Sequence, residues 1–489
     1  TESLVLALGG AALGVAIAPA AVNALLRIHP DALPLVDRVG VDWTLLGVAS
    51  AVAVATGLLF GVVPALQLSR GDVHAVLKEG GRGSGAGGER GRRTRRTLVA
   101  AQLALAVVVA AAAGLLTRSF DRLTSVDPGF QPRGVLTAQV PLPRGSYQSD
   151  TAAMAFFRQL IPRLAATPGV QAVGIVGNLP LGGGGGNWDV DVEGRTTTPG
   201  EAPVSPNVQF VGGDYFRAIG MRARRGRPLG PEDDEGAPLA AVINEAMARM
   251  LWPGQSPLGA RFRVAGPPGE RWMTVVGVMN DVRQASLRDT TRGEYYIPHA
   301  QMHRSTGFTP REMYVVARAS GDPAALAPTL RRILRELDPA VAPSAVRTLR
   351  EVVERSVAQP RLTMLLVAGF GVLALVIAAV GVYGVTAYTV ARRRTEMAVR
   401  LALGARPADV VRLVVRQGMG VAAAGIAVGI VGALAASRVM RSMVFGVSPT
   451  DPATYAAIAA VLLGVALVAT WLPALRTTTV DPASTLRAE

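Results

Sequence analysis

Six long apolar runs constrain the fold of this 489-residue chain more than any other feature of the sequence. A helix needs roughly 20 apolar residues to cross a hydrocarbon core of about 30 Å. Essentially no charge lies inside the runs, where an Arg or Asp would cost about 2.5–3.5 kcal/mol. We therefore expect a multi-pass α-helical membrane protein with spans at residues 4–25, 43–66, 98–117, 362–390, 419–439 and 454–475.

Two strongly basic segments set the expected orientation. Residues 67–96 hold eight Lys or Arg against three acids, and residues 392–416 hold seven Arg against two acids, so each segment carries +5. Basic loops stay on the cytoplasmic side of a membrane, which places both segments inside the cell. They hold ten of the fifteen net positive charges. Topology thus explains most of the basic excess, and no nucleic acid partner is needed.

The region between the third and fourth spans is expected to be a folded α+β domain outside the cytoplasm. Period-two and Val-rich runs predict strands at residues 135–140, 170–176, 273–279 and 313–317. One predicted helix places Phe156, Leu160, Ile161 and Leu164 on one face, and a second begins at Asp322-Pro323. Each helix leads through a proline-containing turn into a Val-rich strand, which indicates a repeated α/β unit.

The two ends of the chain resemble each other. Residues 57–80 read GLLFGVVPALQLSRGDVHAVLKEG, and residues 466–489 read ALVATWLPALRTTTVDPASTLRAE. We interpret the first two spans as a repeat of the last two, left from a preceding four-helix unit. The start at Thr1 is interpreted as a cut through a longer protein. Small residues four apart let membrane helices approach closely, so we expect helix packing at Gly10, Gly14, Gly57, Gly61, Gly425 and Gly429.

Several stretches are similar to one known family. Residues 392–418, RRRTEMAVRLALGARPADVVRLVVRQG, resemble the cytoplasmic loop of FtsX/MacB-type ABC transporter permeases, and the tail VDPASTLRAE resembles the end of that module. The external segments FVGGDYFRAIGMRARRGRPLG, VINEAMARMLWPGQSPLGARF and TVVGVMNDVRQASLRD resemble the periplasmic core domain of the same family. The duplicated arrangement resembles large permeases with two such units in one chain.

The resemblance implies an inner (plasma) membrane permease with an inserted α+β periplasmic core domain. Residues 1–66 would be the last two transmembrane helices of a first unit, 67–96 a basic cytoplasmic linker, and 97–117 the first helix of the second unit. Residues 118–360 would form the periplasmic core domain. Residues 361–489 would supply three further helices, with a cytoplasmic coupling loop at 391–416 and a C-terminal tail.

By the family's pattern, the part that docks on a cytoplasmic ABC ATPase subunit matches Arg393, Glu396, Arg400, Gly404 and Ala405. The residues themselves predict an ion pair between Glu396 and Arg400, one turn apart, and a break at Gly404 before a helix that begins near Pro407. Taken alone, they fit an interfacial helix beside anionic membrane lipids equally well. The resemblance favours docking.

No catalytic arrangement is visible in the sequence. A phosphate-binding P-loop needs a lysine after its glycines, but Lys78, the one lysine, lies in Leu-Lys-Glu. His299 and His303 have metal-ligand spacing, but Pro298 precedes them and no acidic third ligand is near, so we expect a solvated loop and no metal site. The acidic run at 232–235 is interpreted as a solvated turn. We expect no cofactor and no enzymatic activity in this chain.

Three functions remain open at this level. The leading interpretation is a permease subunit that couples ATP hydrolysis in a separate subunit to export or extrusion by mechanotransmission, with a second permease unit as a further partner. The alternative is an FtsX-like transmembrane regulator of a periplasmic enzyme that moves no substrate. An orphan membrane protein without an ATPase is the third. The apolar spans contain no deep ionisable residue, which argues against an ion-driven carrier.

Overall fold

The computed structural model describes residues 2–28, 44, 47–48, 50–52, 54–55, 86–195, 202–265, 271–307, 309–393, 396–397, 399–400 and 403–475. It divides into two compact units, one formed by residues 1–122 with 358–489 and the other by residues 123–357. Both boundaries of the predicted domain 118–360 therefore lie within five residues of the boundaries of the second unit.

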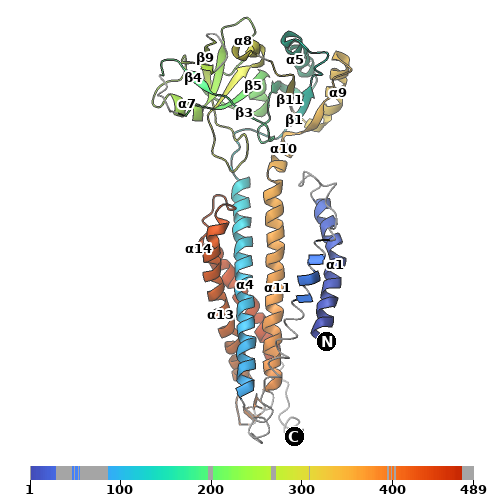
Figure 1. Cartoon of the computed structure of the whole chain (residues 1–489), viewed down its shortest axis with the longest axis vertical. Coiled ribbons are helices and arrows are strands. Elements are labelled where there is room, and N and C mark those ends of the chain that lie inside the picture. Colours follow the sequence, from blue (N-terminus) through green and yellow to red (C-terminus); the bar gives the residue numbers. More distant parts are fainter. Residues whose placement is uncertain are drawn as a thin grey trace. The chain divides into compact units, whose positions relative to one another are not determined.

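The first unit is helical (Figure 1). Its helices are α1 (Glu2–Ile28), α4 (Ala86–Thr124), α11 (Ala358–Arg392), α13 (Pro407–Met440) and α14 (Pro452–Leu475). Among the described residues, four helices are long and apolar enough to cross a bilayer: Arg93–Thr124, Ala358–Arg392, Pro407–Met440 and Pro452–Leu475. Each contains one predicted span, and the chain is a multi-pass helical membrane protein.

The structure describes the two N-terminal predicted spans only in part. Residues 4–25 lie inside α1, in which the described stretch Leu8–Ala20 is apolar. The predicted span 43–66 falls mainly outside the described residues, as do Gly57 and Gly61. The repeat of the first two spans by the last two therefore stays a prediction.

Helix α4 is much longer than its apolar run. It begins at Ala86, so residues 86–96 of the predicted linker are helical, and it continues to Thr124, past the predicted end at residue 117. Apolarity marks only the part of a helix that lies in hydrocarbon, whereas backbone hydrogen bonding continues into water. Arginine is also a good helix former. The cytoplasmic linker at residues 67–96 stays a prediction, with residues 86–96 helical.

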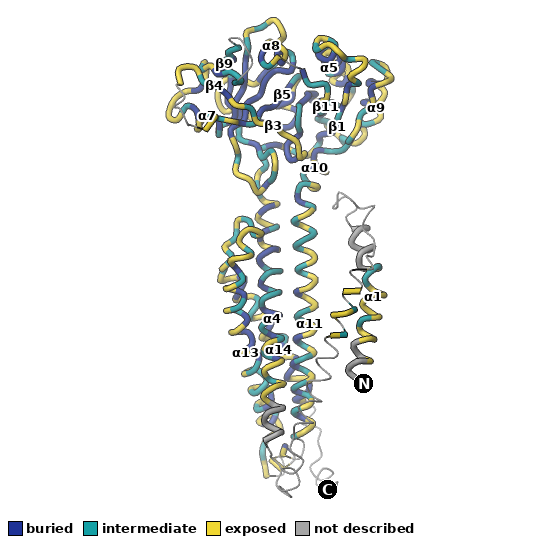
Figure 2. Tube along the Cα trace, in the orientation of Figure 1, coloured by how far each residue is buried: buried dark blue, intermediate teal, exposed yellow. Residues whose placement is uncertain are grey.

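The four helices pack through small residues and apolar side chains. Their shared core is formed by residues such as Leu103 of α4, Val382 of α11, Ile426 of α13 and Leu462 of α14. Large apolar side chains such as Phe370, Val372 and Val431 remain more than half exposed. Figure 2 shows exposed and partly buried stretches along α11 and α13. Such exposed apolar faces suit lipid contact.

The second unit is built on one mixed sheet. Its strands follow the order β12-β1-β11-β2-β5-β10-β7-β9-β8-β4, with β3 paired to β5 and β6 paired to β9. The strands are β1 (Val135–Pro141), β2 (Val170–Val176), β3 (Gly186–Asn187), β4 (Val190–Val192), β5 (Asn207–Gly213), β6 (Ala223–Gly226), β7 (Ala240–Asn244), β8 (Arg261–Val264), β9 (Met273–Met279), β10 (Glu294–Pro298), β11 (Glu312–Ala319) and β12 (Ser344–Thr348). All four predicted strands are confirmed, as β1, β2, β9 and β11.

Helices connect and cover these strands. They are α5 (Asp150–Ala165), α6 (Tyr215–Ile219), α7 (Glu245–Leu251), η2 (His299–Gln301), α8 (Met302–Thr306), η3 (Pro323–Ala325), α9 (Leu326–Leu337) and α10 (Leu349–Ser356). The Asp322 side chain accepts from the Ala324 amide, with proline following it, as the sequence predicted. The start is a 3₁₀ turn, and the α-helix begins at Leu326.

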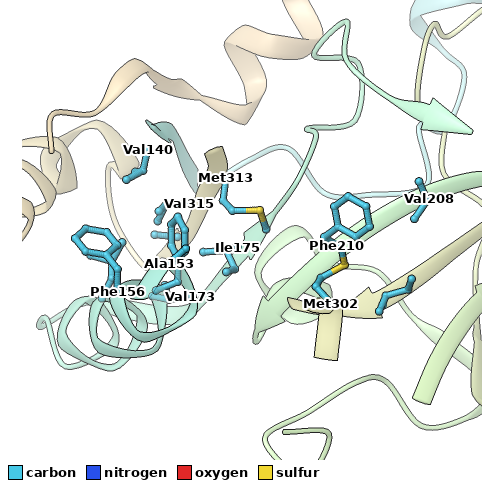
Figure 3. Close-up of a cluster of buried hydrophobic side chains, with 14 of the residues drawn as sticks. Val140, Ala153, Phe156, Val173, Ile175, Val208, Phe210, Met302, Met313 and Val315 are labelled. Carbon is cyan, nitrogen blue, oxygen red and sulfur yellow. The ribbon is translucent and has the colours of Figure 1, made fainter. Parts of the chain in front are cut away.

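The predicted repeat of α/β units is confirmed and gives part of the sheet its topology. The units β1-α5-β2 and β11-α9-β12 interleave, so that their strands lie in the order β12-β1-β11-β2 with antiparallel neighbours. This is a split β-α-β arrangement, into which β3 to β10 are inserted. In the hydrophobic core, Phe156 of α5 belongs to the same cluster as Ile175 of β2 and Val315 of β11 (Figure 3).

One carboxyl group is buried in this sheet. Glu294 of β10 is 1% exposed, and its carboxylate accepts a hydrogen bond from the Tyr296 hydroxyl at 2.8 Å. Burial raises the pKa of Glu294 to about 7 despite that hydrogen bond. The folded domain therefore holds this proton more tightly than the unfolded chain does.

The stability of the core domain should decrease as the pH rises from about 4.5 to about 7, because the unfolded chain loses the Glu294 proton at a lower pH than the folded domain does. The loss from this one group is on the order of 3 kcal/mol. Glu294→Gln should remove that part of the pH dependence. Hydrogen exchange of the β5 and β10 amides in the full chain measures it, with exposed Glu312→Gln as control. An unchanged pH profile in Glu294→Gln would contradict the assignment.

Candidate functional site

The connection between α11 and α13 is short and hydrogen-bonded. The Met397 amide donates to the Arg393 carbonyl at 3.0 Å, and the Leu403 amide donates to the Val399 carbonyl at 2.9 Å. We call this connection, residues 393–406, the coupling segment; it is described except at residues 394, 395, 398, 401 and 402. Its described central residues are helical, and α13 begins directly after it.

Gly404 ends the helical part of the coupling segment. Its φ is +96°, a left-handed conformation that glycine adopts without steric cost. The Ala405 amide donates to the Arg400 carbonyl at 3.0 Å, which is the six-to-one hydrogen bond of a Schellman cap. Pro407 then occupies the first turn of α13. The predicted break at Gly404 and helix start near Pro407 are confirmed.

Ion pairs hold one face of the coupling segment. An Arg400 guanidinium nitrogen lies 2.7 Å from a Glu396 carboxylate oxygen, which confirms the predicted pair. Arg393 approaches the same carboxylate at 3.7 Å and Gln417 of α13 at 3.4 Å. All three charged side chains are partly exposed, so the pairs orient the segment more than they stabilise it.

The opposite faces of the coupling segment differ in burial. Met397 is 6% exposed and packs with Val390, Val410, Val414 and Ala474. Val399 is 41% exposed and Leu403 is 82% exposed. Met397 therefore anchors the coupling segment on the helix ends, whereas Val399 and Leu403 point outward. A surface of this kind can receive a partner protein.

The predicted packing glycines fall into three groups. A side-chain carbon at Gly425 would lie 2.7 Å from the Ala100 carbonyl oxygen of α4, and one at Gly429 would lie 2.8 Å from that of Ala104. At Gly10 and Gly14 of α1, the structure places no atom of another residue within 4 Å of such a carbon. Gly57 and Gly61 lie outside the described residues. The close approach at Gly425 and Gly429 is between α13 and α4.

Other packing positions were missed from the sequence. A side-chain carbon at Gly381 of α11 would collide with Gln102 of α4, whose amide donates to the Ile377 carbonyl at 2.9 Å. One at Gly418 of α13 would lie 2.4 Å from the Thr470 methyl group of α14. Neither has a second glycine four residues away, so the glycine spacing gave no signal for them.

The α13–α14 loop is tied to α4 at the other end of the helices. Arg118 forms an ion pair with Asp451 and donates to the Thr454 hydroxyl at 3.1 Å. The Ser119 hydroxyl accepts from the Phe445 amide at 2.7 Å. The sequence offered only a general signal for these contacts, namely polar residues at the ends of apolar runs. Charged ties thus occur at both ends of the bundle, while Gln102 is a neutral polar tie between them.

The residues considered for chemistry lie elsewhere, in the second unit. His299 is 4% exposed and its ring packs edge-on against Phe157, so the predicted solvated loop was wrong. Burial lowers the pKa of His299 to about 4. His303 instead contacts Asp150 at 2.7 Å. No cluster of three or more metal-ligand side chains occurs among the described residues.

The acidic run at 232–235 is also only partly solvated. Asp233 is 4% exposed and receives two hydrogen bonds from Arg227, at 2.6 and 2.8 Å. The Gly230 amide donates to the same carboxylate at 3.0 Å. A buried carboxylate needs such partners, and Arg227 lies too far back in the sequence to be recognised from the charge run. The prediction of a fully solvated turn was wrong at Asp233.

Two family models match the chain. The MacB-like periplasmic core domain matches residues 97–333, and the FtsX-like permease C-terminal domain matches residues 368–482. Together they include α4, most of the second unit, the coupling segment and the last three described helices. The match supports the assignment of the second unit to the extracytoplasmic side.

Curated relatives share part of this sequence. The macrolide export ATP-binding/permease protein MacB of Bartonella henselae is 25% identical over 205 residues, 41% of this chain and 30% of that protein. MacB of Mannheimia succiniciproducens is 22% identical over 299 residues, 58% of this chain and 44% of that protein. The pyoverdine export ATP-binding/permease protein PvdT of Pseudomonas putida is 24% identical, covering 57% of this chain and 43% of that protein. The chain thus spans less than half the length of these relatives.

Solved structures resemble part of the chain weakly. The periplasmic region of MacB from Actinobacillus actinomycetemcomitans matches with a TM-score of 0.33 and 15% identity, covering 48% of this chain and 96% of that one. The extracellular domain of the ABC-type transporter YknZ from Gram-positive bacteria matches with a TM-score of 0.28 and 18% identity, covering 42% and 93%.

Replacing Gly425 or Gly429 by alanine should weaken the contact between α13 and α4. The added carbon would lie within 3 Å of the α4 backbone, and overpacking of this kind costs on the order of 1–3 kcal/mol. Thermal unfolding of the purified chain in detergent measures the loss. Gly420→Ala is the matched control, because no atom of another residue lies within 4 Å of a carbon added there. Equal melting temperatures for all three variants would contradict the packing role.

Proposed function

The chain belongs to the FtsX/MacB-type ABC transporter permeases, and we propose that it is the membrane subunit through which a nucleotide-binding partner drives export or extrusion. ATP hydrolysis would take place in that partner, since this sequence contains no P-loop lysine motif. The proposal places the chain in the inner membrane with residues 123–357 outside the cytoplasm. The names of its relatives combine ATP binding with a permease, which supports such a pairing.

The observation that carries the proposal is the build of the coupling segment. Helix α11 follows the core domain directly and is long enough to cross the bilayer, so its far end at Arg392 would lie on the cytoplasmic side. The coupling segment begins there. It is short, capped at Gly404 and seated on the helix ends through Met397. A push on it would therefore reach α11 and α13 together.

Docking would use Arg393, Glu396 and Arg400 together with the turn at Gly404 and Ala405. The ion pair at Glu396 keeps the arginines in fixed positions, while Val399 and Leu403 offer apolar area. Nucleotide-dependent movement of the partner would then bias two arrangements of the helices, as coupling between separate sites requires. The bundle would carry mechanical displacement and no ions, because its interior is apolar.

Replacing both members of the ion pair, Glu396→Ala with Arg400→Ala, should weaken complex formation with the ATPase and leave the fold intact. The matched control is Arg350→Ala with Glu354→Ala, an exposed pair at the same spacing and 2.8 Å separation on α10. Co-purification with the nucleotide-binding protein encoded nearest to this gene measures the effect. Undiminished complex formation in the Glu396/Arg400 variant would count against docking at this segment.

Leu403→Glu should also weaken the complex, because it places a charge on the apolar area that would contact the ATPase. The free protein should keep its stability, since this side chain is 82% exposed there. We expect an unchanged melting temperature for the isolated chain and a loss of at least tenfold in affinity for the ATPase, about 1.4 kcal/mol. Leu403→Met is the conservative control. A fall in melting temperature without a change in affinity would show that Leu403 is structural.

Nucleotide-dependent movement of a substrate separates export from regulation. In liposomes that hold the complex, ATP-dependent transfer of a lipoprotein or a drug would support export. An ATP-dependent change in the activity of a periplasmic enzyme, with no transfer, would instead support the FtsX-like regulator. A chain that recruits no ATPase at all would be the orphan protein.

A further inference from the structure

A pocket opens beside the coupling segment, between the ends of α4, α11 and α13. Its walls are mostly aliphatic, with Val382 and Val385 from α11 and Val410, Val414 and Val421 from α13. Thr386, Thr389 and Gln417 add polar atoms. The cavity itself measures about 50 Å³ and continues into a groove that is open to solvent. All of its lining residues belong to the helical unit.

The mouth of this pocket is basic. Three guanidinium groups, those of Arg96, Arg393 and Arg400, line it together with a single carboxylate, that of Glu396. Glu396 already pairs with Arg400 and, more loosely, with Arg393. Arg96 is half-buried, and in the part of the chain that the structure describes it has neither an ion-pair nor a hydrogen-bond partner. A charge that is partly removed from water without a counter-ion favours the binding of an anion.

The neighbouring arginine behaves differently. Arg95 is exposed, and its guanidinium lies 4.1 Å from the centre of the Tyr388 ring. It does not line the pocket. Two adjacent arginines of α4 thus have separate environments: Arg95 stacks on Tyr388 of α11, and Arg96 lines the pocket.

From this geometry we propose that the pocket binds one anionic phospholipid, with the phosphate at Arg96 and Arg393 and an acyl chain against Val385 and Val421, the two partly exposed valines of its wall. Arg96 lies two residues before the apolar run of α4, and Arg393 directly follows the end of α11, so both arginines lie at headgroup depth. Basic pockets between membrane helices on this side are suited to anionic headgroups. A soluble phosphate would use the arginines but leave the valine wall uncovered.

The bound lipid would join α4 to the coupling segment. Its phosphate would bridge Arg96 of α4 and Arg393 at the start of the coupling segment. The lipid would therefore stiffen the part of the bundle that carries displacement. This site stands without the proposed function, because lipid binding is measured on the chain alone.

The test compares Arg96→Gln with Arg95→Gln in the full chain, purified in detergent and stripped of lipid. Both variants lose one positive charge, one residue apart on the same helix. Phosphatidylglycerol, phosphatidylcholine and inorganic phosphate are titrated while melting temperature and lipid adducts in native mass spectra are recorded. We expect phosphatidylglycerol to bind and to raise the melting temperature, with an affinity reduced about fivefold by Arg96→Gln and unchanged by Arg95→Gln.

A second variant tests the acyl part of the site. Val385→Phe fills the pocket and leaves every charge in place, so it should also reduce phosphatidylglycerol binding. Its folding is checked by size exclusion and circular dichroism, and if it fails to fold, Val421→Phe replaces it. Equal binding of phosphatidylcholine, equal losses in the two arginine variants, or an equal response to inorganic phosphate would each overturn the proposal. ATPase co-purification is unaffected by these outcomes, so the two proposals fail separately.

Discussion

The close approach of α13 to α4 is the contact on which the helical unit depends. At Gly425 and Gly429 the backbone of α4 occupies the space where a side chain would be. In a bilayer, apolar side chains gain little by leaving lipid, so van der Waals packing at such small residues has to hold helices together. This contact sets the position of the α4 end that carries Arg96 against the end of α13 that follows the coupling segment. The basic pocket exists because these two ends are held together.

Charged ties between the helices lie at the ends of the bundle. One end has Arg118, Asp451 and Thr454, and the other has Glu396, Arg400 and Arg393. Between them the shared core consists of valine, leucine, isoleucine and alanine side chains. A charge in the middle would be costly, whereas ties at the ends keep the helices in register without desolvation. A bundle of this build is suited to moving as connected rods, in keeping with the proposed mechanical role.

The core domain follows a different logic, since its backbone hydrogen bonds run between distant segments. Strands β1 and β11 are neighbours although about 170 residues separate Val140 from its partner Met313. The sheet also buries polar groups, and they require partners that the same long-range pairing supplies. Asn244, for example, accepts from the amides of Met247 and Glu294, on two different elements. Burial of Glu294 and Asp233 is thus a consequence of sheet order and loop closure.

The sequence by itself determined the elements that depend on local pattern. The four later spans, the four expected strands, the proline-led start near Asp322 and the break at Gly404 all lie where apolar period or backbone chemistry placed them. Only the tertiary structure decided the sheet order, the burial of His299 and Asp233, and which glycines touch a neighbouring helix. It also separated Arg96 from Arg95, two residues that a sequence cannot distinguish. The physical reason is that period and propensity act over a few turns, whereas burial and pairing are set by residues that meet only after the chain has folded.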